Sequence, residues 1–152
     1  MTARDVMTRN VVTISPDATA REAAELMRRH DHAALPVVDD EGHVLGMFTE
    51  SDLLCLTLPK YLEGIDDLSF LPDNFEPFEH PRDEIKTARV RDMLTRTEVS
   101  VVQPDEHVAE VARIMCQQHV RRVPVTEAGK LVGIVARADL VQRIVMPTLL
   151  EG

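Results

Sequence analysis

The sequence predicts an α/β (α+β) fold in which two β-α-β-β-α repeats pack with pseudo-twofold symmetry. Three observations lead to this prediction: a long internal repeat, short β-branched runs that alternate with helix-periodic segments, and a glycine-containing turn late in each copy. The 152 residues are enough for one compact module with a real core. A single copy of about 55 residues would be only marginally stable, so we expect the two copies to pack together.

The repeat keeps its order over most of both copies. The stretch "RDVMTR" at 4–9 returns as "RDMLTR" at 91–96. Further on, "LPVVDDEGHVLGMFTESDLL" from residue 35 returns as "VPVTEAGKLVGIVARADLV" from residue 123. We therefore divide the chain into a first repeat (1–56), an insertion (57–86) and a second repeat (87–152), which together form one module.

Each copy predicts the same elements in the same order. A β-branched run, "VVTI" or "VSVV", indicates a first strand. After Pro-Asp, a helix is predicted by apolar residues at helical spacing, and Thr19-x-x-Glu22 fits a capping box at its start. Two strands joined by a short turn at Gly42 or Gly129 predict an antiparallel hairpin. A final helix is expected to begin near Ser51 or Ala138.

These motifs resemble the cystathionine-β-synthase (CBS) domain, and the tandem resembles a CBS pair, or Bateman module. The matching features are the "VMT" opening, the "LPVVD" strand and the Gly-x-φ-Thr-x-x-Asp signature at Gly46, Thr49 and Asp52. The resemblance implies clefts between the repeats that bind an adenosine derivative such as AMP, ADP, ATP or S-adenosylmethionine. In the family, the signature aspartate holds the ribose and the threonine lies near the phosphate. No cofactor is required.

The signature aspartate also has a purely structural interpretation. Thr49-x-x-Asp52 has the form of a capping box, and an acid in the first turn suits the helix dipole. In the second copy the threonine is replaced by Ala136, which cannot cap, yet Asp139 is retained. This favours a second role for the aspartate, because a carboxylate can accept hydrogen bonds from a ribose diol. We expect Thr49 and Asp52 to serve one cleft and Asp139 the other.

An arginine pair precedes the hairpin of the second copy. Arg121 and Arg122 stand where the first copy has Ala33 and Ala34. Exposed arginines are usually solvated surface residues. The resemblance instead implies that they reach phosphate in the cleft of the opposite copy's aspartate, and Arg137 is expected to join them. The clefts should therefore be unequal, with the phosphorylated ligand on the side of Asp52.

Four further residues are implied only by the resemblance. The family contacts the base through the end of the first strand and through the hairpin, which in this sequence gives Ile14, Ser15, Pro36 and Met47. Core packing is the alternative for Ile14 and Met47, because sequence shows only that they are apolar.

The insertion does not repeat and is not a simple tether. It holds four of the five aromatic residues of the chain, and its eight acids against three bases give a local charge of −5. A flexible linker should be poor in aromatic residues. We expect an ordered, irregular segment that buries its rings against its own repeats or against another chain, with docking of a different protein as a third possibility.

Composition excludes several classes of function. The net charge of −9 argues against nucleic-acid binding, and no apolar run is long enough to insert in a membrane. The start of the chain has no apolar signal region, and Cys55 and Cys116 lie on non-equivalent elements where we expect them to pack as small hydrophobes. These features indicate a cytoplasmic protein without a disulfide framework.

No catalytic motif or nucleophile–base pair is found, so an enzyme is not expected. The leading interpretation is a regulatory adenine-nucleotide sensor that forms a homodimer and acts on a separate effector protein. The alternative is a ligand-independent interaction module that regulates a separately encoded transporter or enzyme.

Overall fold

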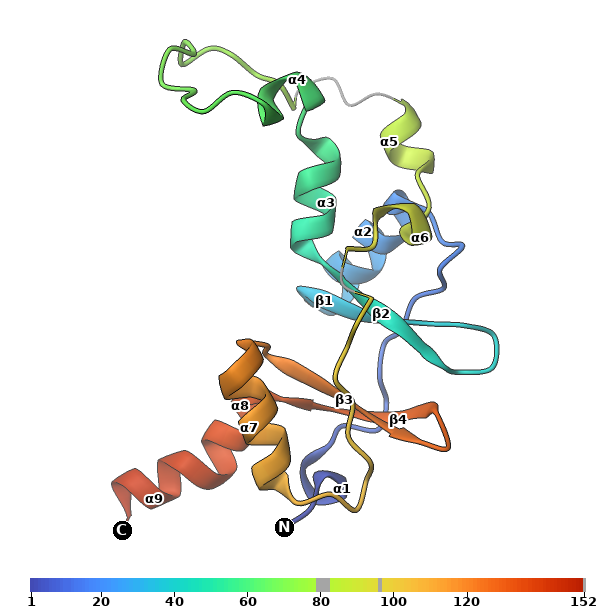
Figure 1. Cartoon of the computed structure of the whole chain (residues 1–152), viewed down its shortest axis with the longest axis vertical. Helices are drawn as coiled ribbons and strands as arrows, with labels where there is room; N and C mark the ends of the chain where they lie inside the picture. Colours follow the sequence, from blue (N-terminus) through green and yellow to red (C-terminus); the bar gives the residue numbers. More distant parts are fainter. Residues whose placement is uncertain (79–82, 96, 152) are drawn as a thin grey trace.

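The architecture comes from a computed structural model, which describes residues 1–78, 83–95 and 97–151 (Figure 1). The molecule is elongated, with two α/β halves stacked along its long axis and the insertion at one end. Within the described residues, no helix combines the length and apolar character needed to cross a membrane.

Four of the five expected elements are present in each copy, in the expected order, and each copy opens with a short helix that was not expected. The first copy contains α1 (Ala3–Val6), α2 (Ala20–His30), β1 (Ala34–Val38), β2 (Val44–Thr49) and α3 (Glu50–Thr57). The second contains α6 (Val90–Met93), α7 (Val108–Gln118), β3 (Arg122–Glu127), β4 (Lys130–Ala136) and α8 (Arg137–Leu140). Helix α8 continues without a break into a π-helical turn, η1 (Val141–Val145), and then into α9 (Met146–Leu150). The insertion contains α4 (Lys60–Glu63) and α5 (Asp83–Thr87).

The two predicted hairpins are confirmed. Strands β1 and β2 pair antiparallel, as do β3 and β4. Gly42 and Gly129 have φ angles of 90° and 81° in the connecting turns, where a side chain would be strained. The turns also join the two halves, because the amide of Leu131 donates to the carbonyl of Gly42 at 2.9 Å.

The predicted first strands are much shorter than expected. Ile14 and Val102 each make a single parallel bridge, to Val37 and Val125 respectively, so neither run forms a named strand. Each run is soon followed by Pro16 or Pro104, which cannot donate a backbone hydrogen bond and therefore cannot extend the ladder.

Side-chain caps define the start of the long helices. The hydroxyl of Thr19 accepts from the amide of Glu22 at 3.2 Å, which is one of the two bonds of the expected capping box. In the second copy, Nδ1 of His107 accepts from the amide of Ala109 at the start of α7. Both helices end at a residue in the left-handed conformation, Asp31 or His119.

Two hydrophobic cores are present, and each contains the opening segment of the other copy. Ala3 and Val6 of α1 are buried against α7, β3 and β4, whereas Val90 of α6 is buried with α2, β1 and β2. Backbone bonds fix this exchange: the amide of Ala3 donates to Glu106, and the amide of Val90 donates to the carbonyl of Ala18. The repeats in the sequence therefore do not coincide with the two folded halves, as the position of α1 in Figure 1 shows.

The last helix contains a π turn because of a proline. The amide of Met146 donates to the carbonyl of Val141, five residues back, in place of the usual four. Pro147 has no N–H, so it cannot bond the carbonyl of Arg143 in an α-helical ladder. The wider turn keeps the chain helical from residue 137 to residue 150.

One expectation about burial is wrong, and for the insertion one of the two alternatives does not hold for three of its four rings. Cys55 and Cys116 are both free and exposed, so the prediction that they pack as small hydrophobes is wrong. They lie on the outer faces of their helices, which sequence periodicity over a short segment did not resolve. In the insertion, Tyr61, Phe70 and Phe78 are also exposed and are not buried against the chain's own repeats.

Candidate functional site

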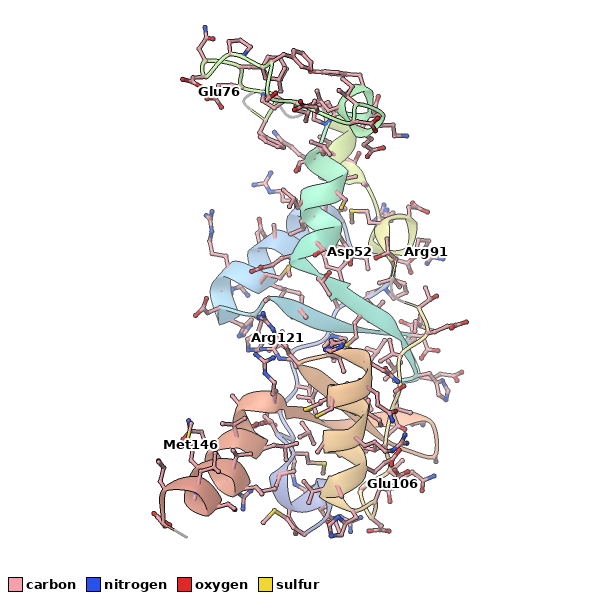
Figure 2. The ribbon with its side chains drawn as sticks, turned by 60° about the vertical axis from the view of Figure 1, so that its left-hand side comes forward. Asp52, Glu76, Arg91, Glu106, Arg121 and Met146 are labelled. Carbon is pink, nitrogen blue, oxygen red and sulfur yellow. The ribbon has the colours of Figure 1, made fainter. Side chains whose placement is uncertain are left out.

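A cleft of about 740 Å³ lies between the two halves. Its walls come from four places where a strand or a helix begins: the starts of β1 and β3 and the starts of α3 and α8. Residues 98–100, 118–120 and 141–142 complete it on the side of the second copy. Figure 2 shows Arg121 at the junction between the upper and lower halves.

The hairpin register explains why these four starting points meet. Ala34 pairs with Thr49 and Arg122 pairs with Ala136, so each hairpin brings the start of its first strand beside the end of its second. The following helices begin at once, because the amide of Glu50 donates to the carbonyl of Ala33 at 3.0 Å. In the second copy the amide of Arg137 donates to the carbonyl of Arg121 at 2.7 Å.

Three arginines line the cleft without a carboxylate partner. Within the described part of the chain, Arg121, Arg122 and Arg137 form no ion pair. Arg122 is partly buried, and its Nη1 donates to the carbonyl of Ala34 at 3.1 Å. Elsewhere, four arginines each form an ion pair with an acid: Arg4, Arg21, Arg91 and Arg113. The cleft therefore gathers positive charge in a chain whose net charge is −9.

A nearby histidine responds to this positive charge. The pKa of His32 is lowered, first because burial disfavours its charged form and then because the Arg122 guanidinium repels a second positive charge. The start of α3, at Glu50 and Ser51, adds the positive end of a helix dipole to the same wall. These groups favour an anion in the cleft.

Two acids limit how much negative charge the cleft accepts. Glu50 and Glu98 line the same walls as the three arginines. Neither side chain makes a hydrogen bond or an ion pair with another described residue. The formal charge of the cleft is thus +1, from three arginines and two glutamates.

The signature aspartate of the first copy lies behind the wall of the cleft. Asp52 is 3 % exposed and does not line the cleft. Its Oδ2 accepts from the amide of Thr49 at 2.9 Å, which completes the capping interaction at the start of α3. Its Oδ1 accepts from the hydroxyl of Thr95 at 2.8 Å, so both carboxylate oxygens have protein partners.

The aspartate of the second copy is in a different state. Asp139 is partly exposed and follows Ala138, which lines the cleft, although Asp139 itself does not. With Ala136 at the N-cap, no side-chain cap is formed. The Asp139 carboxylate makes no hydrogen bond to any described residue. The loss of the side-chain cap expected from Ala136 is therefore confirmed.

The structure brings together five of the ten residues expected to bind ligand. Thr49, Met47 and the three arginines line the cleft. Ile14 and Pro36 are buried and bonded to each other through the amide of Ile14 and the carbonyl of Pro36. Ser15 is exposed, and its hydroxyl accepts from the amide of Asp17. These three, like the two aspartates, are outside the lining.

Sequence reasoning missed Thr95 and the segment that follows it. Thr95 contacts Asp52 from 43 positions along the chain, and residues 98–100 form one wall of the cleft. One signal was available, because the threonine is retained in both opening motifs, at Thr8 and Thr95. Among the described residues, no group of histidine, cysteine, aspartate and glutamate could hold a metal ion.

The fold and the site define a tandem-repeat α/β module with an anion-accepting cleft between its halves. The family model of the CBS domain matches residues 3–56 and 90–146, and the chain belongs to this family. It is 31 % identical over 137 residues to the CBS domain-containing protein YhcV of Bacillus subtilis, covering 90 % of this chain and 81 % of that protein.

Solved structures agree with this assignment. A CBS domain-containing protein of unknown function from Kribbella flavida superposes with a TM-score of 0.79 at 25 % identity, covering 95 % of this chain and 99 % of that one. CBSX2, solved in complex with AMP, superposes with a TM-score of 0.71 at 26 % identity, covering 97 % of this chain and 98 % of that chain. The fold is therefore that of a CBS pair.

Proposed function

We propose that this protein is a regulatory sensor that binds an adenine nucleotide in the cleft between its two halves. The observation that carries the proposal is the group of three arginines that line the cleft without an acidic partner. Guanidinium groups near one another repel, so such a group is best stabilised by a bound anion, and phosphate is the anion that arginine recognises best.

The charge of the cleft favours a nucleoside monophosphate over a triphosphate. Three arginines against Glu50 and Glu98 leave a formal charge of +1, which suits a phosphate of charge about −1.5 to −2 better than a longer polyphosphate chain. The similar CBSX2 chain has been solved with AMP, which supports the same ligand class here.

The two signature aspartates would take part to different extents. Asp139 has a carboxylate without a partner among the described residues and can accept hydroxyls of a ribose directly. Asp52 can do so only if the hydroxyl of Thr95 releases Oδ1. We propose that AMP binding through Asp52 exchanges this protein hydrogen bond for one to the ribose.

Such an exchange gives the sensor a means of transmission. Thr95 lies at the start of the segment that leads to Glu98, Val99 and Ser100, which form one wall of the cleft. A ligand that contacts both halves and replaces the Thr95 bond has a different affinity for the two arrangements of this segment. Differential affinity of this kind shifts the balance between arrangements and can be read by an effector protein.

Calorimetric titration of the full chain with AMP, ADP and ATP tests the proposal. We expect AMP to bind more tightly than ATP. The Arg121→Ala, Arg137→Ala double variant should lose at least tenfold in AMP affinity, because each lost charge-assisted hydrogen bond is worth about 1.5–3 kcal/mol. Neither side chain makes a hydrogen bond within the described protein, so folding should be unaffected.

The matched control is the Arg28→Ala, Arg29→Ala variant, which removes two adjacent exposed arginines from the end of α2, outside the cleft. It should bind AMP like the unmodified protein. Equal affinity in all three proteins would rule out the cleft as the binding site. If the unmodified protein bound no adenine nucleotide, the proposed sensor function would be wrong.

The alternative function, a ligand-independent interaction module, is favoured by one observation. Tyr61, Phe70 and Phe78 of the insertion are exposed, and exposed aromatic residues are enriched at interfaces. Under this alternative a homodimer would regulate a separate protein without any nucleotide. A thermal-shift screen distinguishes the two, because a ligand at 100 times its Kd stabilises the fold by about 2.7 kcal/mol.

A further inference from the structure

The two halves carry opposite charges at equivalent positions of the cleft. Glu50 is the first residue of α3, and Arg137 is the first residue of α8. The amide of Glu50 donates to the carbonyl of Ala33. In the same way, the amide of Arg137 donates to the carbonyl of Arg121. The repeat therefore places an acid on the first half at the point where it places a base on the second.

Glu50 has no partner within the described protein. Among the described residues of the first half that line the cleft, it is the only charged one, whereas the three arginines all belong to the second half. Its side chain is exposed and forms no ion pair with another described residue. An acid in the first turn suits the helix dipole, but the capping carboxylate of Asp52 already fills that role in α3.

Arg122 brings positive charge close to this acid. Its Nη1 donates to the carbonyl of Ala34 at 3.1 Å, so the guanidinium reaches from the second half to the first. Ala34 pairs with Thr49, the residue before Glu50. A phosphate chain that begins at the other two arginines of the cleft and extends toward Arg122 therefore approaches the Glu50 carboxylate.

We propose that Glu50 limits the number of phosphates that the cleft accepts. The first phosphate of an adenine nucleotide lies against the arginines of the second half, and each further phosphate brings negative charge toward the Glu50 carboxylate, which repels it. The inference rests on the proposed nucleotide binding. It assigns the preference for AMP over ATP to one residue.

Two variants of Glu50 test this role by calorimetric titration of the full chain with AMP and ATP, in buffer without magnesium so that ATP keeps its full charge. Glu50→Arg introduces the residue that the second copy has at the equivalent position. It should raise the affinity for ATP relative to AMP by about tenfold or more. Glu50→Gln changes the charge by half as much, and should raise the same ratio by about threefold.

Two control variants separate the position of the charge from its amount. Glu127→Arg changes the net charge as much as Glu50→Arg does, at an exposed residue outside the cleft, and should leave the ratio unchanged. Glu98→Gln removes the other acid of the cleft, which lies on the side of the second half. It should raise the affinity for both nucleotides and change their ratio less than Glu50→Gln does.

Salt provides a readout that a purely structural role of Glu50 would not change. Screening shortens the range of a charge from about 30 Å at 0.01 M salt to about 3 Å at 1 M. The gain in relative ATP affinity of Glu50→Arg should therefore shrink as salt is added. Circular dichroism and thermal melting check that the variants are folded, since Glu50→Arg places a cation at the positive end of the α3 dipole. Glu50→Gln avoids this cation.

Three results would overturn the role of Glu50: an unchanged ratio in both Glu50 variants, an equal change in Glu127→Arg, or as large a change in Glu98→Gln as in Glu50→Gln. If the unmodified protein still binds AMP in these cases, the proposed function stands. If the unmodified protein binds neither nucleotide, the proposed function is wrong. In that case ATP binding gained by Glu50→Arg would still support the role of Glu50, and no binding by the variant would overturn it.

Discussion

Thr95→Val is the most direct test of the hydrogen-bonding arrangement behind the cleft. The substitution keeps the shape of the side chain and removes the hydroxyl that donates to Oδ1 of Asp52 at 2.8 Å. Asp52 is 3 % exposed, so its carboxylate depends on protein partners. A hydrogen bond to a charged group contributes about 1.5–3 kcal/mol. Thr95 is exposed, so water can partly replace the hydroxyl, and we expect the lower end of this range.

The effect on the melting temperature follows from the size of the chain. A loss of about 1.5 kcal/mol corresponds to a decrease of about 3–6 °C for a domain of this length. Differential scanning calorimetry of the full chain, without ligand, measures it. Thr97→Val is the matched control, because Thr97 is exposed on the same segment and makes no side-chain hydrogen bond to a described residue.

A double-mutant cycle with Asp52→Ala isolates the pair. The free energies of unfolding lost in the two single variants, added together, should exceed the free energy lost in the double variant. The excess should be about the strength of the hydrogen bond. If Thr95→Val melts at the same temperature as Thr97→Val, the Thr95–Asp52 bond does not stabilise the fold. The exchange proposed for ligand binding would then lose its basis.

Two further outcomes are expected. Gly133→Ala should destabilise the fold by about 1–3 kcal/mol, because its Cβ would lie 2.6 Å from Sδ of Met7 and 3.0 Å from the carbonyl oxygen of Thr8, whereas Gly64→Ala meets nothing within 4 Å and should be neutral in thermal melts. The pKa of the Asp39 carboxyl is lowered, chiefly by the backbone N–H of His43. The ionised Asp39 carboxylate therefore contributes its full stabilisation when the pH is above 3.8, the ordinary pKa of the group. This stabilisation is lost as the pH falls through the lower pKa that the group has in the folded protein. The melting-temperature difference between the unmodified protein and Asp39→Asn should shrink in acid, and a constant difference would contradict this.

The secondary structure was largely predictable because it depends on local patterns. Helical spacing of apolar residues located α2 and α7, and the turns at Gly42 and Gly129 predicted both hairpins. The length of the first strands was overestimated. A β-branched run indicates an extended backbone, but it does not show how many of its residues pair with a neighbouring strand. Ile14 and Val102 each form a single β-bridge.

The site was less predictable because it depends on long-range contacts. The arginines were found from a difference between the copies, since Ala33 and Ala34 stand at the equivalent positions. The bond between Thr95 and Asp52 could not be found in this way, because it joins the opening motif of one copy to the signature of the other. Sequence identity between repeats shows which residues are equivalent but not which of them meet in space.

The exchange of opening segments has a consequence for synthesis of the protein. When the ribosome has made the first repeat, its core still lacks Val90, and Ala3 and Val6 have nothing to pack against until α7 and β3 exist. The first half can therefore not complete its core before Met93 has emerged, and the second half cannot do so before Leu140 has emerged. A chain cut within the insertion should yield two fragments, each with an incomplete hydrophobic core. The fragments should regain their structure only when they associate.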